Sequence, residues 1–183
     1  MRVLFTLLLS TFLGALAMAG SPQNDYAQRL DKLFAALHNA TDETAAKLAE
    51  MQIWAIWASD DTPEAVTELA QASAAMNAGA SDLAESKLNE LVQNHPTFAE
   101  GWNRRATLYF MLGRYDESLS DIAKVLELEP RHFGALSGKG MVLRAQNKPA
   151  EALKAMKDAL AINPNLIGLK DAVEKLEKLN PEL

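Results

Sequence analysis

AEGWNRRATLYFMLGRYDESLSDIAKVLELEPRH, residues 99–132, is one unit of a sequence that repeats along this 183-residue chain. Two segments of helical periodicity flank a turn at Gly113, and Pro130 closes the unit. Prolines recur at the same place in each unit, 34 residues apart, at positions 96, 130 and 164. A period of about 34 residues predicts stacked helix–turn–helix repeats. One hairpin cannot bury its apolar side alone, so neighbouring hairpins must stack to form a continuous core.

The residue types inside this unit resemble the tetratricopeptide repeat (TPR) position by position. Trp102 and Tyr109 occupy its fourth and eleventh places. Ala106 and Ser118 occupy the eighth and twentieth, where small side chains let two antiparallel helices approach closely. The resemblance implies an all-α fold, a TPR α-solenoid of stacked helical hairpins. The segment 101–138 also resembles small exported bacterial TPR proteins.

The repeat frame divides the chain into six parts. They are a signal peptide at 1–19, an N-terminal helical hairpin at 20–62, a degenerate first repeat at 63–98, a second repeat at 99–132, a third at 133–166 and a capping helix at 167–183. We interpret the hairpin as either a diverged repeat or a cover for the open end of the first repeat. The last helix places Leu169, Val173, Leu176 and Leu179 on one side and charged residues on the other, as the end of a repeat array requires.

The seventh place of each repeat departs from the family pattern. This place is usually Leu in TPR proteins, but here it is Gln71, Arg105 and Lys139. We expect the two cations to pack their aliphatic stems against the helices, with their charged ends in solvent or beside a carboxylate.

The N-terminus has the pattern of a secretory signal peptide. Met1 and Arg2 precede an apolar run over 3–16, and an Ala-Met-Ala site follows at 17–19. The apolar run is shorter than the roughly 20 residues that a membrane span needs. We therefore expect cleavage after Ala19, a periplasmic or secreted product, and no membrane span after cleavage. The alternative is an uncleaved anchor, because Arg2 is the single basic residue before the apolar run.

The composition excludes several functional classes. The chain has no cysteine, which excludes thiol catalysis and cysteine-bound metal. Its formal net charge of -6 disfavours nucleic acid as a partner, because phosphate contacts need clustered Lys and Arg. Its histidines, His38, His95 and His132, are isolated and have no partner at metal-ligand spacing. We find no catalytic constellation, and we predict neither an enzyme, nor a metal site, nor a cofactor.

The TPR resemblance implies a concave groove lined by the first helix of each repeat, at places two, five, nine, twelve and thirteen. The contacts that we predict for a bound partner are Asn103, Thr107, Phe110, Met111, Met141 and Arg144. The remaining places fall on Glu100, Gly134, Ser137, Ala145, Val66, Leu69, Ser73, Met76 and Asn77. Adaptable apolar side chains beside Asn and Arg suit a peptide with apolar anchors. We therefore expect a protein-binding module without chemistry, an adaptor or assembly factor of the bacterial periplasm.

The residues at the same repeat positions exclude one class of partner that other TPR domains bind. Cochaperone TPR domains clamp a C-terminal carboxylate with Lys and Asn at places five and nine of one repeat and with basic residues in the third. The corresponding residues here are Leu69 and Ser73 in the first repeat, and Gly134 and Gly138 in the third. The sequence therefore predicts that the partner is not an Hsp70 or Hsp90 tail.

A cluster of basic residues in the middle of the array has two interpretations. Its members are Arg104, Arg105, Arg131, His132 and Arg144. They form either a second binding site or, as we favour, ion pairs that lock adjacent repeats together.

The pair Trp54 and Trp57, one helical turn apart, also has two interpretations. We favour packing against the first repeat, because aromatic pairs on amphipathic helices usually lie in the core. The alternative is an exposed face through which the chain self-associates, as a homo-oligomeric structural protein of the envelope.

Overall fold

The computed structural model describes residues 22–59 and 62–182, and the predicted signal peptide lies outside the described residues. This part of the chain is helical and contains no strand. Its helices are α1 (Pro22–His38), α2 (Glu43–Trp57), α3 (Pro63–Asn77), α4 (Ser81–Asn94), α5 (Ala99–Met111), α6 (Tyr115–Leu128), α7 (Phe133–Ala145), α8 (Pro149–Ile162) and α9 (Ile167–Leu179).

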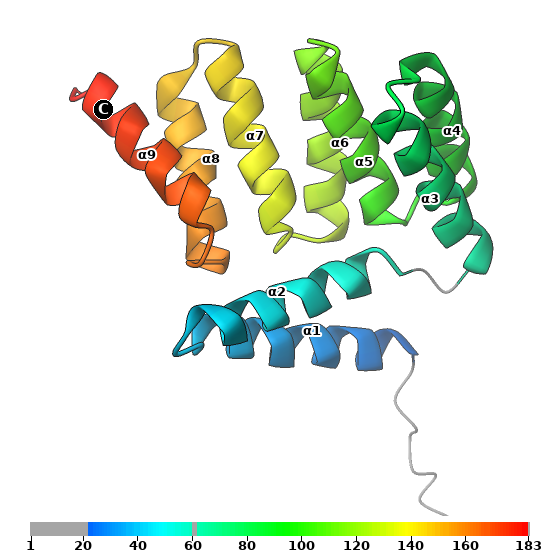
Figure 1. The fold of residues 1–183 in the computed structure, drawn as a ribbon, viewed down its shortest axis with the longest axis horizontal. Coiled ribbons are helices and arrows are strands. Elements are labelled where there is room, and N and C mark those ends of the chain that lie inside the picture. Colours follow the sequence, from blue (N-terminus) through cyan, green and yellow to red (C-terminus); the bar gives the residue numbers. More distant parts are fainter. Residues whose placement is uncertain (1–21, 60–61, 183) are drawn as a thin grey trace, which may run out of the picture.

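Three helical hairpins, α3–α4, α5–α6 and α7–α8, stack side by side, and α9 packs on the last of them (Figure 1). Each second helix contacts the first helix of the next repeat. This arrangement confirms the predicted all-α TPR solenoid. In α9, Val173 and Leu176 are buried as expected, but Leu179 is exposed because no further helix covers the end of the array.

Small residues bring the two helices of a repeat together, as the eighth and twentieth places predict. The Ser118 hydroxyl donates a hydrogen bond to the carbonyl of Ala106 across the α5–α6 pair, at 2.8 Å. In the third repeat, a Cβ on Gly140 would lie only 2.5 Å from Cγ of Met156. Any larger side chain at position 140 would therefore push α8 away from α7.

The turn inside each repeat uses a residue in the left-handed region of backbone space. Gly79 and Gly113 have φ of 71° and 73° in the first two repeats, and Asn147 takes the equivalent place in the third with φ of 59°. Asn is among the few residues other than Gly that tolerate this conformation. The three turns therefore match although only two contain glycine.

Two of the three polar residues at the seventh place pair with the second helix of the same repeat, whereas Lys139 is exposed. Arg105 donates two hydrogen bonds to the Asp121 carboxylate, each 2.8 Å long, and Gln71 accepts one from Lys87 at 2.8 Å. Both pairs span 16 residues, because the two places face each other across the hairpin. The hydrogen bond to Asp121 raises the pKa of the Arg105 guanidinium above its ordinary value. These polar pairs replace the apolar contact that Leu makes in the family pattern.

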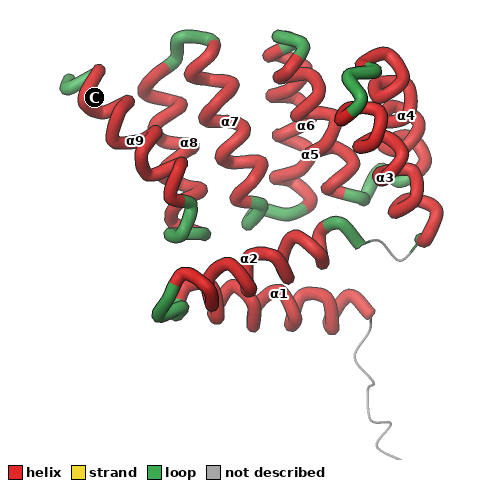
Figure 2. Tube along the Cα trace, in the orientation of Figure 1, coloured by secondary structure: helices red, strands yellow, loops and turns green. Residues whose placement is uncertain are grey.

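The N-terminal hairpin occupies a place that neither sequence interpretation anticipated. Helices α1 and α2 lie across the lower ends of α5, α7 and α9, facing the loops that precede α7 and α9 (Figures 1 and 2). The hairpin does not stack on α3 in the manner of a repeat, and it leaves the open side of the first repeat uncovered. Both predictions for residues 20–62 were therefore wrong about how the hairpin packs.

Polar contacts fix this position of the hairpin. Arg131, in the loop before α7, donates a hydrogen bond of 2.7 Å to Asp31 of α1, and its guanidinium lies 4.4 Å above the Phe34 ring. Tyr26 lies at the same junction, where burial, together with the nearby Glu129 carboxylate, raises its pKa to about 12. These contacts join α1 to the boundary between the second and third repeats.

The two tryptophans pack within the chain, but against the third repeat rather than the first. Trp57 is buried, and its ring stacks on His132 with centroids 4.1 Å apart. Trp54 meets His132 and Phe133 edge to face, at 5.4 Å in both cases. The prediction of packing was right, but the predicted partner was wrong. The self-association alternative loses its basis, because this face is already used inside the molecule.

Gly134 provides a test of this packing. A Cβ at position 134 would lie 2.4 Å from Cη2 of Trp54, whose ring is held by Trp57 and Phe133. We expect Gly134→Ala to lower the free energy of unfolding by about 1–3 kcal/mol, the usual cost of overpacking a filled core. Urea unfolding followed by circular dichroism measures this change.

Gly168→Ala is the matched control. Gly168 is the second residue of α9, as Gly134 is of α7, and a Cβ there meets nothing within 4 Å. We expect this change to raise the free energy of unfolding by about 0.5–1 kcal/mol, the ordinary advantage of Ala in a helix. An equal effect of the two substitutions would contradict the packing of Trp54 on α7.

Candidate functional site: a groove across the first helices of the repeats

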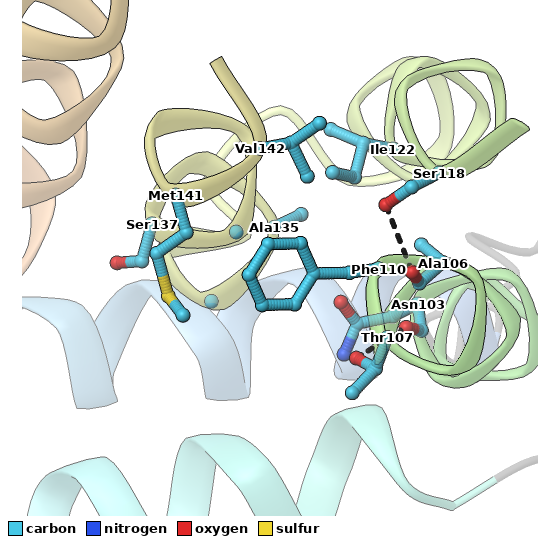
Figure 3. Close-up of a pocket in the computed structure, with 12 residues that line it drawn as sticks. Asn103, Ala106, Thr107, Phe110, Ser118, Ile122, Ala135, Ser137, Met141 and Val142 are labelled. Carbon is cyan, nitrogen blue, oxygen red and sulfur yellow. Dashed lines mark hydrogen bonds between the residues drawn. The ribbon is translucent and has the colours of Figure 1, made fainter. Parts of the chain in front are cut away.

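A hollow of about 180 Å³ lies between α5 and α7 on the groove side of the array (Figure 3). It is lined by Asn103, Ala106, Thr107, Phe110, Ser118, Ile122, Gly134, Ala135, Ser137, Gly138, Met141 and Val142. Four of the predicted contacts, Asn103, Thr107, Phe110 and Met141, therefore come together in one place. The helical period explains this, because residues three and four places apart share one face of α5.

The hollow is apolar, with a polar edge on one side. Figure 3 shows the Phe110 ring lying between α5 and α7, with Ile122 and Val142 above it in this view and Met141 on the α7 side. Asn103 and Thr107 form the edge on α5. The Thr107 hydroxyl donates to the carbonyl of Asn103 at 2.9 Å. Such a surface offers anchoring by flexible and aromatic side chains, with one amide to orient a peptide backbone.

The other two predicted contacts lie outside this hollow. Met111 is exposed near the end of α5 and does not line it. Arg144 lines a second hollow between α7 and α9, to which Ser137 and Met141 also contribute. Arg144 is exposed and makes no ion pair with any residue in the described part of the chain. Met141 therefore belongs to both hollows and joins them.

Three positions that the repeat frame assigns to the groove have other roles. Leu69 is buried in the core of the first repeat. Gly134 lies against Trp54 of the hairpin, although it also borders the α5/α7 hollow. Glu100 is buried, with 1% of its surface exposed. The repeat frame gives the direction in which a side chain leaves the helix, but not what covers it afterwards.

Three donors satisfy the buried Glu100 carboxylate. Asn103 and Arg104 each donate to it at 2.9 Å, and Nε2 of His132 lies 3.4 Å from Oε2. The other ring nitrogen of His132, Nδ1, accepts from the backbone N–H of Ala135 at 3.0 Å and so caps α7. The ring proton therefore lies on Nε2 and points at the carboxylate. A buried carboxylate without such donors would be strongly destabilising.

Ion pairs account for most of the predicted basic cluster, but they do not lock adjacent repeats together as the favoured interpretation held: they lie within α5, between α5 and α6 of one repeat, and between the loop before α7 and α1. Arg104 pairs with Glu100 at 2.9 Å, Arg105 with Asp121 at 2.8 Å, and Arg131 with Asp31 at 2.7 Å. These cations serve the packing of the helices. Among the described residues, no group of three or more His, Asp or Glu side chains is placed to hold a metal ion.

Sequence reasoning missed the contribution of α2. Glu50 of α2 lines the α7/α9 hollow beside Arg144. Glu50, Met51 and Trp54 also line a hollow with Asn165 and Ile167. No signal in the repeat frame could have placed them there, because the hairpin lies outside the frame. None of the helices in the described part of the chain is long and apolar enough to cross a membrane.

Comparison with known proteins identifies the family. A tetratricopeptide repeat model matches residues 97–165. A TPR repeat-containing protein of Rhizobium etli is 40% identical over 138 residues, which are 75% of this chain and 67% of that protein. The chain belongs to the tetratricopeptide repeat family. This chain spans less than a quarter of the length of several other curated relatives that it matches.

Solved structures share the fold of this TPR chain. The first TPR of Spaghetti (RPAP3), bound to an HSP90 peptide, has a TM-score of 0.62 and 22% identity, covering 65% of this chain and 94% of that one. The crystal structure of MamA has a TM-score of 0.59 and 18% identity, covering 75% of this chain and 78% of that one. None of these proteins is described as an enzyme.

His132 provides a test of the buried network. His132→Ala removes the cap of α7, the stack on Trp57 and the bond to Glu100, so we expect a clear loss of stability. His132→Asn restores only the cap, because Oδ1 of Asn takes the place of Nδ1. We expect His132→Asn to be about 1 kcal/mol more stable than His132→Ala, the usual value of an N-cap. Urea unfolding of the three proteins measures the difference, and wild-type stability in both variants would contradict the network.

Proposed function

We propose that this protein is a non-catalytic binding module, an adaptor or assembly factor of the bacterial periplasm that holds a peptide segment of another protein in its groove. One observation carries the proposal. Phe110 and Met141, from neighbouring repeats, border one apolar hollow whose edge is formed by Asn103 and Thr107. An apolar hollow with few polar groups is the usual character of a peptide-binding groove in a helical repeat.

The family supports the general mode of binding but not the identity of the partner. The RPAP3 domain that shares this fold was solved with an HSP90 peptide bound. The residues at the clamp places of this chain, Leu69, Ser73, Gly134 and Gly138, provide no cation or amide for a terminal carboxylate. We therefore infer that the partner is recognised through internal apolar side chains rather than through its C-terminus.

Crosslinking in the native envelope fraction, followed by identification of the captured protein, tests the groove. We expect Phe110→Ala to reduce capture at least tenfold, because truncating an aromatic anchor in a binding hollow commonly costs more than about 1.4 kcal/mol. Arg144→Ala tests the second hollow in the same way. Leu83→Ala is the control, since Leu83 is an exposed apolar residue of α4 outside the groove. Undiminished capture by Phe110→Ala, with an unchanged circular dichroism spectrum, would contradict a groove site.

The proposed location rests on the N-terminal pattern of an apolar run followed by Ala17-Met18-Ala19. We expect the protein from bacterial cells to lack residues 1–19 and to begin at Gly20. Intact-mass measurement of periplasmic and cytoplasmic fractions tests this. Recovery of the uncleaved chain in the cytoplasmic fraction alone would contradict export.

A further inference from the structure

The hollow between α5 and α7 has the size of one large side chain. Its volume is about 180 Å³. An engineered apolar cavity of about 150 Å³ in another protein binds one benzene molecule, whereas sites for drug-sized ligands begin at about 300 Å³. The hollow is therefore too small for a whole peptide segment, but it matches the side chain of one residue of that segment.

None of the described residues that line this hollow is charged. Its polar lining residues are Asn103, Thr107, Ser118 and Ser137. The hydroxyls of Thr107 and Ser118 already donate to backbone carbonyls of α5, at 2.9 and 2.8 Å, and Asn103 donates to Glu100 at 2.9 Å. A charged group placed here would lose its hydration without gaining a counter-ion, which is strongly unfavourable. The side chain that the hollow accepts is therefore uncharged.

Two of the lining side chains favour an aromatic occupant. The Phe110 ring lies between α5 and α7, with Met141 on the α7 side (Figure 3). Two aromatic rings in contact gain more than the area that they bury, and a thioether beside a ring adds a further favourable contact. An aliphatic side chain in the same hollow would gain neither. We therefore expect phenylalanine rather than leucine as the occupant.

Gly138 gives the hollow its depth on the α7 side. A Cβ at position 138 would lie 3.7 Å from Cδ1 of Ile122, an ordinary contact distance, and both residues line the hollow. Alanine would therefore fit the fold at this place, unlike at Gly140, where a Cβ would lie 2.5 Å from Cγ of Met156. Glycine inside a helix is less stable than alanine. The packing of the helices does not require Gly138, so its effect is on the space left for a ligand.

We propose that the α5/α7 hollow takes one phenylalanine side chain of the partner, and that Gly138 is the residue that sets this specificity. The phenylalanine ring lies between Phe110 and Met141, in the space that a side chain at position 138 would fill. This inference rests on the proposed function, because it names the side chain that the same groove selects.

A phage-displayed library of random 12-residue peptides, selected on the full chain, provides the probe. Selected peptides are synthesised with a fluorescent label, and their dissociation constants are measured by fluorescence anisotropy. We expect one position of the selected peptides to be enriched in Phe. Replacing this Phe by Val should weaken binding at least tenfold, because the hollow is then left partly empty. Replacing it by Glu or Lys should weaken binding further.

Gly138→Ala tests the specificity residue. Its methyl group occupies part of the hollow, so we expect the Phe peptide to bind about fivefold more weakly and its advantage over the Val peptide to shrink. The same substitution should raise the midpoint of thermal unfolding, because alanine stabilises the interior of a helix. Weaker binding by a more stable protein cannot result from a loss of fold.

Gly168→Ala is the matched control. Gly168 lies on α9, does not line the α5/α7 hollow, and a Cβ there meets nothing within 4 Å. We expect a similar rise in the unfolding midpoint, with the affinity for the Phe peptide and its advantage over the Val peptide both unchanged.

Phe110→Ala separates this inference from the proposed function. Peptides weakened by Phe110→Ala that show no preference for Phe would overturn the inference and leave the groove intact. The same holds if Gly138→Ala leaves the advantage of the Phe peptide over the Val peptide unchanged. Peptides unaffected by Phe110→Ala, or a library that yields no binder, would overturn both.

Discussion

The buried imidazole of His132 joins three parts of the chain that are remote in sequence. One face of its ring stacks on Trp57 of the N-terminal hairpin. One nitrogen caps α7 of the third repeat, and the other points at Glu100 of the second repeat. A polar ring buried in this way must satisfy both of its nitrogens, and residues of the second and third repeats do so while the hairpin covers its face. The hairpin, the second repeat and the third repeat therefore depend on one another at this residue.

The aromatic contacts at this junction explain where the hairpin lies. A two-helix hairpin needs a large apolar surface against which to bury its own core. The first repeat presents an open side, but the hairpin instead uses Phe133 and the loops before α7 and α9, with Ile162 and Leu166 at the edge of the shared core. Trp54 and Trp57 of the hairpin meet His132 and Phe133 at this junction. These aromatic contacts, together with the ion pair between Arg131 and Asp31, distinguish this surface from the open side of the first repeat.

These facts show which features a sequence predicts well. The repeats, the glycine turns and the small residues at the helix contacts follow from a local period, because each repeat packs mainly on its neighbours. The hollow at Phe110 and Met141 follows from the same frame. The burial of Glu100 does not, since its partner His132 is 32 residues away and is itself covered by the Trp57 ring of α2. The position of the hairpin cannot be predicted from the repeat period either, because Asn165 of the third repeat and Leu37 of the hairpin meet across 128 residues.

The packing of the hairpin also determines what kind of groove this TPR array has. In the repeat frame, the second place of the third repeat faces a ligand, but here Gly134 lies beneath Trp54. The hairpin thus occupies the end of the groove where α5, α7 and α9 begin, and it provides the exposed face of α2 in exchange. Because His132 both stacks on Trp57 of the hairpin and caps α7, the shape of the groove and the stability of the third repeat have a common origin.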